Sequence, residues 1–232
     1  MIPIRITGAV INAFAILIGS GIGLLLMGRI SDRFAKNIHR ALGLCVCIIG
    51  ISGALGGDVM LLVVAMALGT LFGELLRIDD GLNRLGKWAQ TKLSREGEQS
   101  TFAEGFVTAT LLFCVGAMAV VGSIDSGLRD DQNVILTKSM IDGAASIILA
   151  STLGFGVLFS AFMVLLYQGG IEFFAGFLQN VFTDGLIMQI AAIGGVMIFG
   201  IGLNMTLDTK IKVANFLPGF LVAVGYYFLI LR

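Results

Sequence analysis

Apolar stretches recur along the whole chain and are separated by polar connections. A helix needs roughly 20 predominantly apolar residues to cross the hydrocarbon core of a bilayer, and these stretches approach or reach that length. They cover residues 7–27, 41–55, 60–76, 102–124, 185–205 and 215–231. The pattern predicts an all-α fold: a polytopic helical membrane protein with about seven to eight membrane segments.

The region 134–182 is also apolar, but charged residues and glycines interrupt it, Gly154 among them. It is too long for one crossing of a hydrocarbon core of about 30 Å, and its length suits two crossings. Whether one of these segments is short or re-entrant stays open.

The positions of Lys and Arg also favour two crossings, because cytoplasmic connections of membrane proteins are rich in these residues. Two crossings place the basic segments 28–40, 77–101 and 206–214 together on the cytoplasmic side. The 168–184 connection, which has no Lys or Arg, then lies outside, as do both ends of the chain.

The longest polar connection, about 79–101, carries an apolar stripe at helical spacing, formed by Leu82, Leu85, Trp88 and Leu93. Basic residues lie between these positions, which is typical of an amphipathic helix at the cytoplasmic interface with its Trp at headgroup depth. A solvated linker helix is the alternative. With this segment included, residues 1–232 are expected to form a single integral membrane domain.

Glycine is unusually frequent, with 32 residues in a chain of 232. Gly19 and Gly23, and likewise Gly69 and Gly73, form G-x-x-x-G motifs, which let helix backbones approach closely. Such packing can occur within one chain or between copies in a homo-oligomer. The sequences around the two motifs also align with each other, which indicates either internal repeats or chance similarity between glycine-rich helices.

Composition and charge narrow the function classes. Apolar residues make up 57% of the chain and charged residues 13%, the formal net charge is zero, and the mean hydropathy is +0.97. A neutral chain gives no reason to expect nucleic-acid binding. The three cysteines lie in apolar stretches without metal-ligand spacing, so we expect buried free thiols.

No known catalytic motif is present in the sequence. The single histidine, His39, lies in a basic connection, and there is no H-E-x-x-H motif, P-loop or nucleotide fingerprint. We therefore expect no enzyme activity, no catalytic residues, no cofactor and no metal site. The expected partners are the lipid bilayer and a small solute or ion.

The strongest candidate for binding a solute or ion is Asp142, since an ionisable residue within a membrane segment is costly and is often functional. It lies about 12 Å along a helix that starts near residue 134, which is close to the middle of the membrane. Lys138 is four residues earlier, on the same helix face. The two residues form either a binding site or an ion pair that only neutralises itself.

Further polar residues within the apolar stretches are candidates for the same site, or else hydrogen-bond neighbouring helices together. The uncharged candidates are Ser123, Asn12, Asn204 and Gln189. Glu74 and Glu104 are candidates for an ionisable pathway. The alternative for Glu74 is an interface salt bridge with Arg77, one turn later, and that for Glu104 is an orientation toward the headgroups.

Several short motifs occur in an order that is typical of one family. They are Phe113-Cys114-Val115-Gly116-Ala117-Met118-Ala119, Thr137-Lys138-Ser139, Asp142-Gly143, Tyr167-Gln168-Gly169 and Gly200-Ile201-Gly202-Leu203-Asn204. In these motifs, and over essentially its whole length, the chain resembles the YdfK/YqgA-type family of bacterial integral membrane proteins, a family of unknown function. The resemblance implies a multi-pass protein of the bacterial cytoplasmic (inner) membrane, and it implies no activity.

Two functions fit these observations. A transporter or channel for a small solute or ion would account for Asp142 and for the glycine-interrupted region 134–182. A structural or regulatory membrane protein without transport activity would account for the glycine-rich packing and needs no substrate. We expect the transporter.

Overall fold

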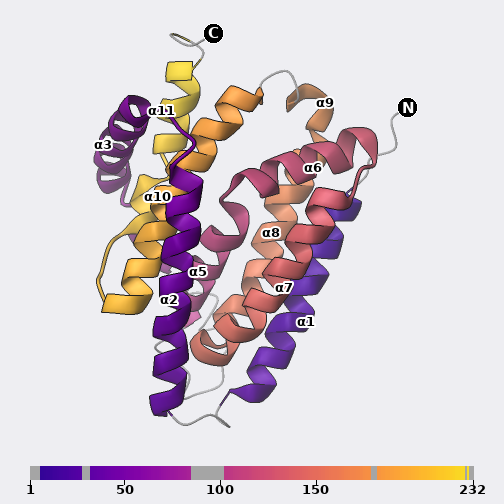
Figure 1. Ribbon diagram of the computed structural model, residues 1–232, viewed down its shortest axis with the longest axis vertical. Coiled ribbons are helices and arrows are strands. Elements are labelled where there is room, and N and C mark those ends of the chain that lie inside the picture. Colours follow the sequence, from indigo (N-terminus) through magenta and orange to yellow (C-terminus); the bar gives the residue numbers. More distant parts are fainter. Residues whose placement is uncertain (1–5, 28–31, 85–101, 179–181, 228, 230–232) are drawn as a thin grey trace. The chain divides into compact units, whose positions relative to one another are not determined.

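The computed structural model describes residues 6–27, 32–84, 102–178, 182–227 and 229 (Figure 1). Every regular element within these ranges is a helix, which confirms the all-α prediction. The helices form two compact units, and each unit combines two separate stretches of the chain. Unit 1 contains residues 1–36 and 85–182, and unit 2 contains residues 37–84 and 183–232.

Unit 1 combines the first helix of the chain with a later run of helices that follow one another after short breaks. Its helices are α1 (Thr7–Leu26), α5 (Phe102–Cys114), α6 (Ala117–Arg129), α7 (Asn133–Leu153), α8 (Phe155–Phe173) and the short α9 (Ala175–Leu178). Figure 1 shows α1 beside α7 along nearly its whole length, with α8 next to them.

The close approach of α1 and α7 depends on the first G-x-x-x-G motif. A methyl group added at Gly19 would overlap the backbone oxygen of Gly143, and one added at Gly23 would overlap that of Ile147. The contact positions rise together along both helices, so α1 and α7 run parallel. The motif therefore packs two helices of one chain together.

Gly154 separates α7 from α8 with φ 75° and ψ −153°, a backbone conformation that is open to glycine and strained for other residues. The region 134–182 therefore holds two long helices, as its length predicts. Gly169 of α8 lies near Ile6 and Ala9, at the beginning of α1. Since Gly154, at the opposite end of α8, follows the end of α7, α8 runs antiparallel to α1.

The expected single segment 102–124 is wrong in one respect, because it is broken. Helix α5 ends at Cys114 and α6 begins at Ala117, and the two are bent by 60° relative to each other. Gly116 has φ 139° at the break, and only glycine adopts this conformation easily. The pair is either a broken span or a re-entrant segment.

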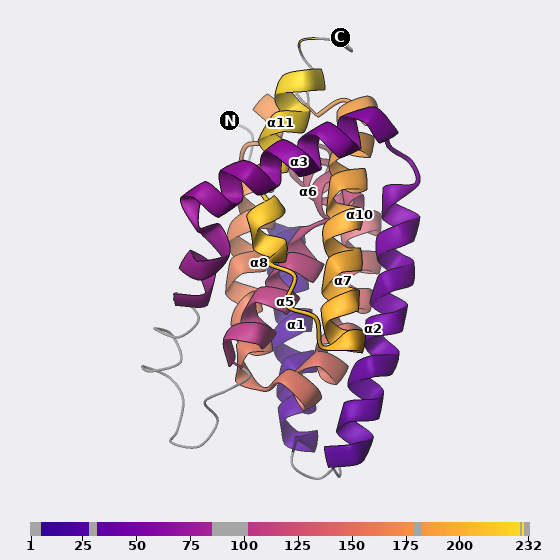
Figure 2. The same cartoon turned by 90° about the vertical axis from the view of Figure 1, so that its left-hand side faces the viewer.

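Unit 2 contains most of α2 (Asp32–Ala54), together with α3 (Val59–Leu76), α10 (Asp184–Leu207), the 3₁₀ turn η1 (Val213–Phe216) and α11 (Gly219–Tyr226). Helices α2 and α10 pack through glycines, because a methyl group added at Gly195 would overlap the backbone oxygen of Gly50. Figure 2 shows α3 beside α11, and the G-x-x-x-G motif of α3 contacts η1 and the beginning of α11. A methyl group at Gly73 would overlap the backbone of Asn215.

The last apolar segment starts as a 3₁₀ turn and not as an α-helix, whereas the sequence pattern predicts a membrane helix from residue 215. Asn215 lies within η1, and α11 begins at Gly219, directly after Pro218. A proline has no backbone N–H to donate and is well tolerated at the start of a helix but not inside one.

Six described helices are long and apolar enough to cross a membrane, and a seventh candidate arises if the bent pair α5 and α6 counts as one span. The residues from Val213 to Tyr226 form a shorter apolar helix. The chain is therefore a polytopic α-helical membrane protein, and the count of seven to eight segments stays a prediction. Of the expected interfacial helix at 79–101, residues 79–84 are helical and 85–101, with Trp88 and Leu93, lie outside the described residues.

Candidate functional site

Lys138 and Asp142 lie one turn apart on α7 and form a buried ion pair. The whole residues are 6% and 5% exposed, and Lys138 Nζ donates to Asp142 Oδ2. This is the pairing that their i, i+4 spacing predicts. Two opposite charges are therefore enclosed in the interior of unit 1.

Two amide side chains from neighbouring helices join this ion pair. Asn12 of α1 donates through Nδ2 to Asp142 Oδ2 at 2.9 Å and to Gln168 Oε1 of α8 at 3.0 Å. Asn12 and Gln168 are fully buried. The small residues that let α1 approach α7, such as Gly19, bring Asn12 within reach of the carboxylate. The polar cluster thus combines one acid, one base and two amides from three helices.

A second buried carboxylate lies where α8 meets the beginning of α1. Glu172 Oε1 accepts the backbone N–H of Ala9 at 2.7 Å, and the residue is 3% exposed. No side chain caps α1 from its own N-cap residue, Ile6. Glu172 therefore satisfies one of the free N–H groups of the first turn, where the helix dipole favours negative charge.

The absence of a side chain at Gly8 makes room for this contact. A Cβ at Gly8 would lie 2.7 Å from Glu172 Oε1 and 2.9 Å from Ser126 Oγ of α6. The same point is 2.8 Å from Ile135 Cγ2 of α7. Helices α1, α6, α7 and α8 consequently converge around the Glu172 carboxylate.

Several buried polar atoms of unit 1 have no hydrogen-bond partner among the described residues. They are Asn12 Oδ1, Gln168 Nε2, Glu172 Oε2, Ser123 Oγ, Ser20 Oγ and Thr110 Oγ1. Leaving a buried polar group without a hydrogen bond costs about 1–3 kcal/mol. Two of these atoms, Asn12 Oδ1 and Gln168 Nε2, belong to the cluster around the ion pair and are suited to binding water, an ion or a polar solute.

The structure brings three of the predicted site residues together: Lys138, Asp142 and Asn12. Ser123 is buried in the same unit, on α6. Glu104 is also in unit 1, but it is exposed in the first turn of α5, outside the polar cluster.

Three other predicted site residues belong to unit 2 and contact residues of that unit. Gln189 Oε1 accepts the backbone N–H of Asp58 at 2.9 Å, directly before α3. Asn204 binds both backbone groups of Ile211 at 2.9 Å and so fixes the turn after α10. Glu74 has Lys212 as its ion-pair partner among the described residues, at 3.9 Å, and not Arg77 as expected. Arg77 has φ 51° and ends α3.

Sequence reasoning missed Gln168 and Glu172, because it assigned residues 168–184 to a connection. The structure corrects this assignment: α8 continues to Phe173, and both residues are buried on it. Their i, i+4 spacing and the aromatic pair Phe173 and Phe174 that follows were the available signals. In a helix this spacing places both side chains on one face, and the two phenylalanines continue the apolar stretch beyond residue 168.

The expectation that all three cysteines are buried is wrong. Cys45 is exposed on α2, while Cys47 and Cys114 are half-buried, and all three are free thiols. Leu44 and Ile48 on α2 are exposed as well, so Cys45 is part of an apolar outer surface of the kind that faces lipid.

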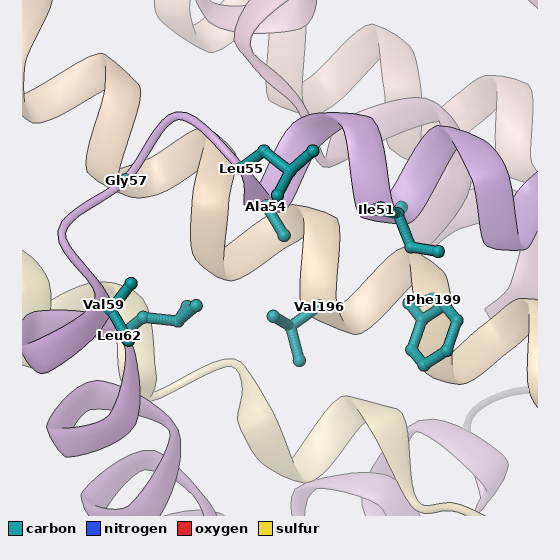
Figure 3. Close-up of a pocket in the computed structure, with 9 residues that line it drawn as sticks. Ile51, Ala54, Leu55, Gly57, Val59, Leu62, Val196 and Phe199 are labelled. Atoms are coloured by element: carbon teal, nitrogen blue, oxygen red, sulfur yellow. The ribbon is translucent and has the colours of Figure 1, made fainter.

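Unit 2 contains an apolar pocket of about 260 Å³ between α2, α3 and α10. Figure 3 shows that the labelled side chains around it, including Ile51, Leu62 and Phe199, contain only carbon atoms. A pocket of this kind offers no hydrogen bonds or charges for recognising a polar solute or an ion. The buried polar cluster of unit 1 is therefore the better candidate site.

Long apolar helices with an ion pair and two amides in their interior define this chain as a multi-pass membrane protein with a polar internal site. The family model described as "Protein of unknown function (DUF554)" matches residues 7–228. The chain belongs to this family.

Two relatives support the assignment. The uncharacterized membrane protein YdfK of Bacillus subtilis (strain 168) is 32% identical over 228 residues, which cover 96% of each chain. The uncharacterized protein YqgA of Escherichia coli (strain K12) is 26% identical over 223 residues, or 94% of this chain and 95% of the relative. No solved structure matches the chain. The predicted resemblance to the YdfK/YqgA-type family is confirmed.

Proposed function

We propose that this protein is a transporter or channel of the bacterial cytoplasmic membrane that carries a small solute or ion past Asp142. The observation that carries the proposal is the buried cluster of Lys138, Asp142, Asn12 and Gln168, in which Asn12 Oδ1 and Gln168 Nε2 have no partner among the described residues. A charged or strongly polar cluster inside a membrane protein is costly, and its usual role is in a transport path.

In this proposal, the ion pair is the resting state of the site. Asp142 accepts hydrogen bonds from Lys138 and Asn12, so an incoming cation or donor group must replace part of these contacts. Gln168 and Asn12 provide further donors and acceptors for a polar solute. Binding is therefore an exchange of partners around one carboxylate.

The break between two helices of unit 1 also supports transport. Gly116 separates α5 from α6 within one apolar segment. Interrupted helices are frequent around the binding sites of transporters, where free backbone groups line a cavity.

Transport can be tested with full-length protein in proteoliposomes, using isotope-labelled Na⁺ and Rb⁺ and a set of labelled small amino acids as probes. We expect Asp142→Asn to abolish uptake of the transported probe while the protein stays folded, because the amide keeps the volume and an acceptor for Asn12. Glu104→Gln, which removes an exposed carboxylate of the same unit, is the matched control and should retain uptake.

A structural or regulatory role without transport is the second candidate, and one observation favours it: the two charges neutralise each other within a single helix. In that case, both Lys138→Met and Asp142→Asn should lower stability by about 3–5 kcal/mol, the typical cost of breaking a buried pair. The double variant Lys138→Met/Asp142→Leu should recover most of it.

Melting temperatures in detergent, measured beside the uptake assays, separate the two candidates. Recovery of stability in the double variant would contradict the transport proposal if it occurs together with one of two uptake results. These results are normal uptake in Asp142→Asn, or no uptake of any probe by the wild type.

A further inference from the structure

We propose that Glu172 is the residue at which this protein binds a coupling proton, and that the polar side chains between Glu172 and the turn between α6 and α7 line the path by which the proton reaches it. The inference rests on the proposed transport function and adds the coupling ion to it. It is carried by the contacts of Glu172 and by a chain of hydrogen bonds on each side of this residue.

In the described part of the chain, the groups that face Glu172 are neutral. From α1 it faces the backbone N–H groups of Gly8 and Ala9, and from α6 the hydroxyl of Ser126. Ile135 of α7 contacts the same space. Among the described residues, no Lys, Arg or His pairs with this carboxylate and no second acid faces it.

Asp142 differs from Glu172 in this respect, because Lys138 compensates its charge. Among the described residues of unit 1, the buried charged groups are two carboxylates and one ammonium, so one of these carboxylates has no counter-ion among them. A buried carboxylate without a counter-ion is costly, and taking up a proton removes its charge without requiring space.

A chain of side chains links Glu172 to the exposed turn between α6 and α7. Ser126, which faces Glu172, donates to Gln132 Oε1 at 3.1 Å. Gln132 Nε2 in turn donates to Asp130 Oδ1 at 3.4 Å, and Asp130 is the exposed end of this series of side chains. The Lys and Arg pattern predicts that this end of unit 1 lies outside, where an inward proton gradient would supply protons.

The opposite side of Glu172 leads toward Asp142. Gln168 is one turn away on the same face of α8, and its Nε2 and the Oε2 of Glu172 are an unused donor and an unused acceptor. Gln168 then binds Asn12, and Asn12 binds Asp142. Polar groups are thus continuous from the exposed turn to the ion pair, except at the gap between Gln168 and Glu172.

The position of Glu172 also explains how a proton would affect the solute site. An ionised Glu172 holds the first turn of α1 through Ala9, and a neutral carboxyl interacts less strongly with the helix dipole. Asn12, which binds Asp142, lies one turn further along the same helix. Protonation would loosen α1 from α8 where α1 contributes to the solute site.

Proton binding is tested directly by infrared spectroscopy of the purified full-length protein. The spectrum should contain the band of a buried protonated carboxylic acid, which is lost in Glu172→Gln and retained in Glu104→Gln. Glutamine keeps the oxygen that accepts the Ala9 N–H, so the variant should fold. A band that persists in Glu172→Gln, or that disappears in Asp142→Asn instead, would overturn the proposal.

The hydrogen-bond chain predicts one further result. Ser126→Ala should slow hydrogen–deuterium exchange of the Glu172 carboxyl. Ser160→Ala is the control and should not slow it, because the Ser160 hydroxyl binds the backbone of its own helix. Equal exchange rates in both variants would contradict the proposed route.

Coupling is tested in proteoliposomes with whichever labelled probe the wild type carries. An imposed pH gradient should drive uptake by the wild type but not by Glu172→Gln, while exchange of labelled for unlabelled probe without a gradient continues in the variant. Gradient-driven uptake in Glu172→Gln would refute the coupling role and leave the transport proposal intact. Loss of exchange in Asp142→Asn tests the transport proposal separately.

Discussion

Asp142 and Glu172 are both buried acids, but different neighbours satisfy them. The first has an ammonium and an amide, and the second has a backbone N–H and lies beside a hydroxyl whose hydrogen is donated to Gln132. A buried charge is tolerated when a counter-ion and hydrogen bonds replace its lost hydration. The contrast predicts that removing Lys138 affects Asp142 strongly and Glu172 weakly.

Asp79 is a carboxylate outside the membrane-spanning helices, and it predicts a pH effect on stability. Burial raises the pKa of Asp79 above its ordinary value, more than the Ala214 N–H, Lys212 and Asn83 lower it. The acid form is therefore the one that folding favours.

The contribution of Asp79 to stability is fully present below its unfolded pKa of 3.8 and is lost as the pH rises through its higher folded pKa. Asp79→Asn should remove this loss, so the melting temperature of the variant should fall less than that of the wild type between acidic and neutral pH. Asp184→Asn, an exposed aspartate of the same unit, is the control. If the melting temperatures of Asp79→Asn and the wild type change with pH in parallel, the Asp79 carboxyl contributes nothing to the pH dependence of stability.

At the level of helices, glycine determines which elements lie together. The first G-x-x-x-G motif packs α1 on α7, and the second packs α3 on η1 and α11. Both motifs therefore have an intrachain role, and neither needs a second copy of the protein to explain it. Whether the two motifs belong to an internal repeat stays a prediction.

Helix α1 offers a matched pair of substitutions. Alanine at Gly19 would overlap the backbone of Gly143, whereas Gly21 has open space around its Cβ position. We expect Gly19→Ala to destabilise the protein by about 1–3 kcal/mol. Gly21→Ala should leave stability unchanged or raise it by up to about 1 kcal/mol, because alanine favours the helix.

Unfolding in mixed detergent micelles with increasing SDS measures both variants against the wild type. Similar destabilisation by the two substitutions would mean that helix propensity, and not the contact with α7, determines the effect.

For the whole molecule, the Lys and Arg pattern predicts an orientation that chemical labelling can test. In a background without cysteine, a thiol at Phe177, which is 74% exposed, should react with a membrane-impermeant maleimide in intact cells. Position 177 is better suited than Ala175, which is buried. A thiol at Thr209, in the basic segment 206–214, should react only after the membrane is permeabilised. The reverse result at position 177 would contradict the double crossing of 134–182.

The helical class of the protein and its family follow from local information. An apolar stretch of sufficient length predicts a membrane helix. The spacing of Lys138 and Asp142 predicts their contact, because both residues are on one helix. Glycine at residue 116 permits a break, but the pattern of apolar residues continues across it. The sequence alone therefore predicts one segment where the structure has α5 and α6.

The composition of the polar cluster depends on contacts between residues far apart in the chain. Asn12 meets Asp142 across 130 positions, and Ala9 meets Glu172 across 163. No periodicity encodes such pairs, because they arise only when α1 packs on α7 and α8. Gln189 and Asn204, which look equivalent to Asn12 in the sequence, bind backbone groups of unit 2 instead, and the partner of Gln189, Asp58, is also far away along the chain. Apolar length and helical spacing act within one segment, whereas a buried polar site is formed by the packing of several.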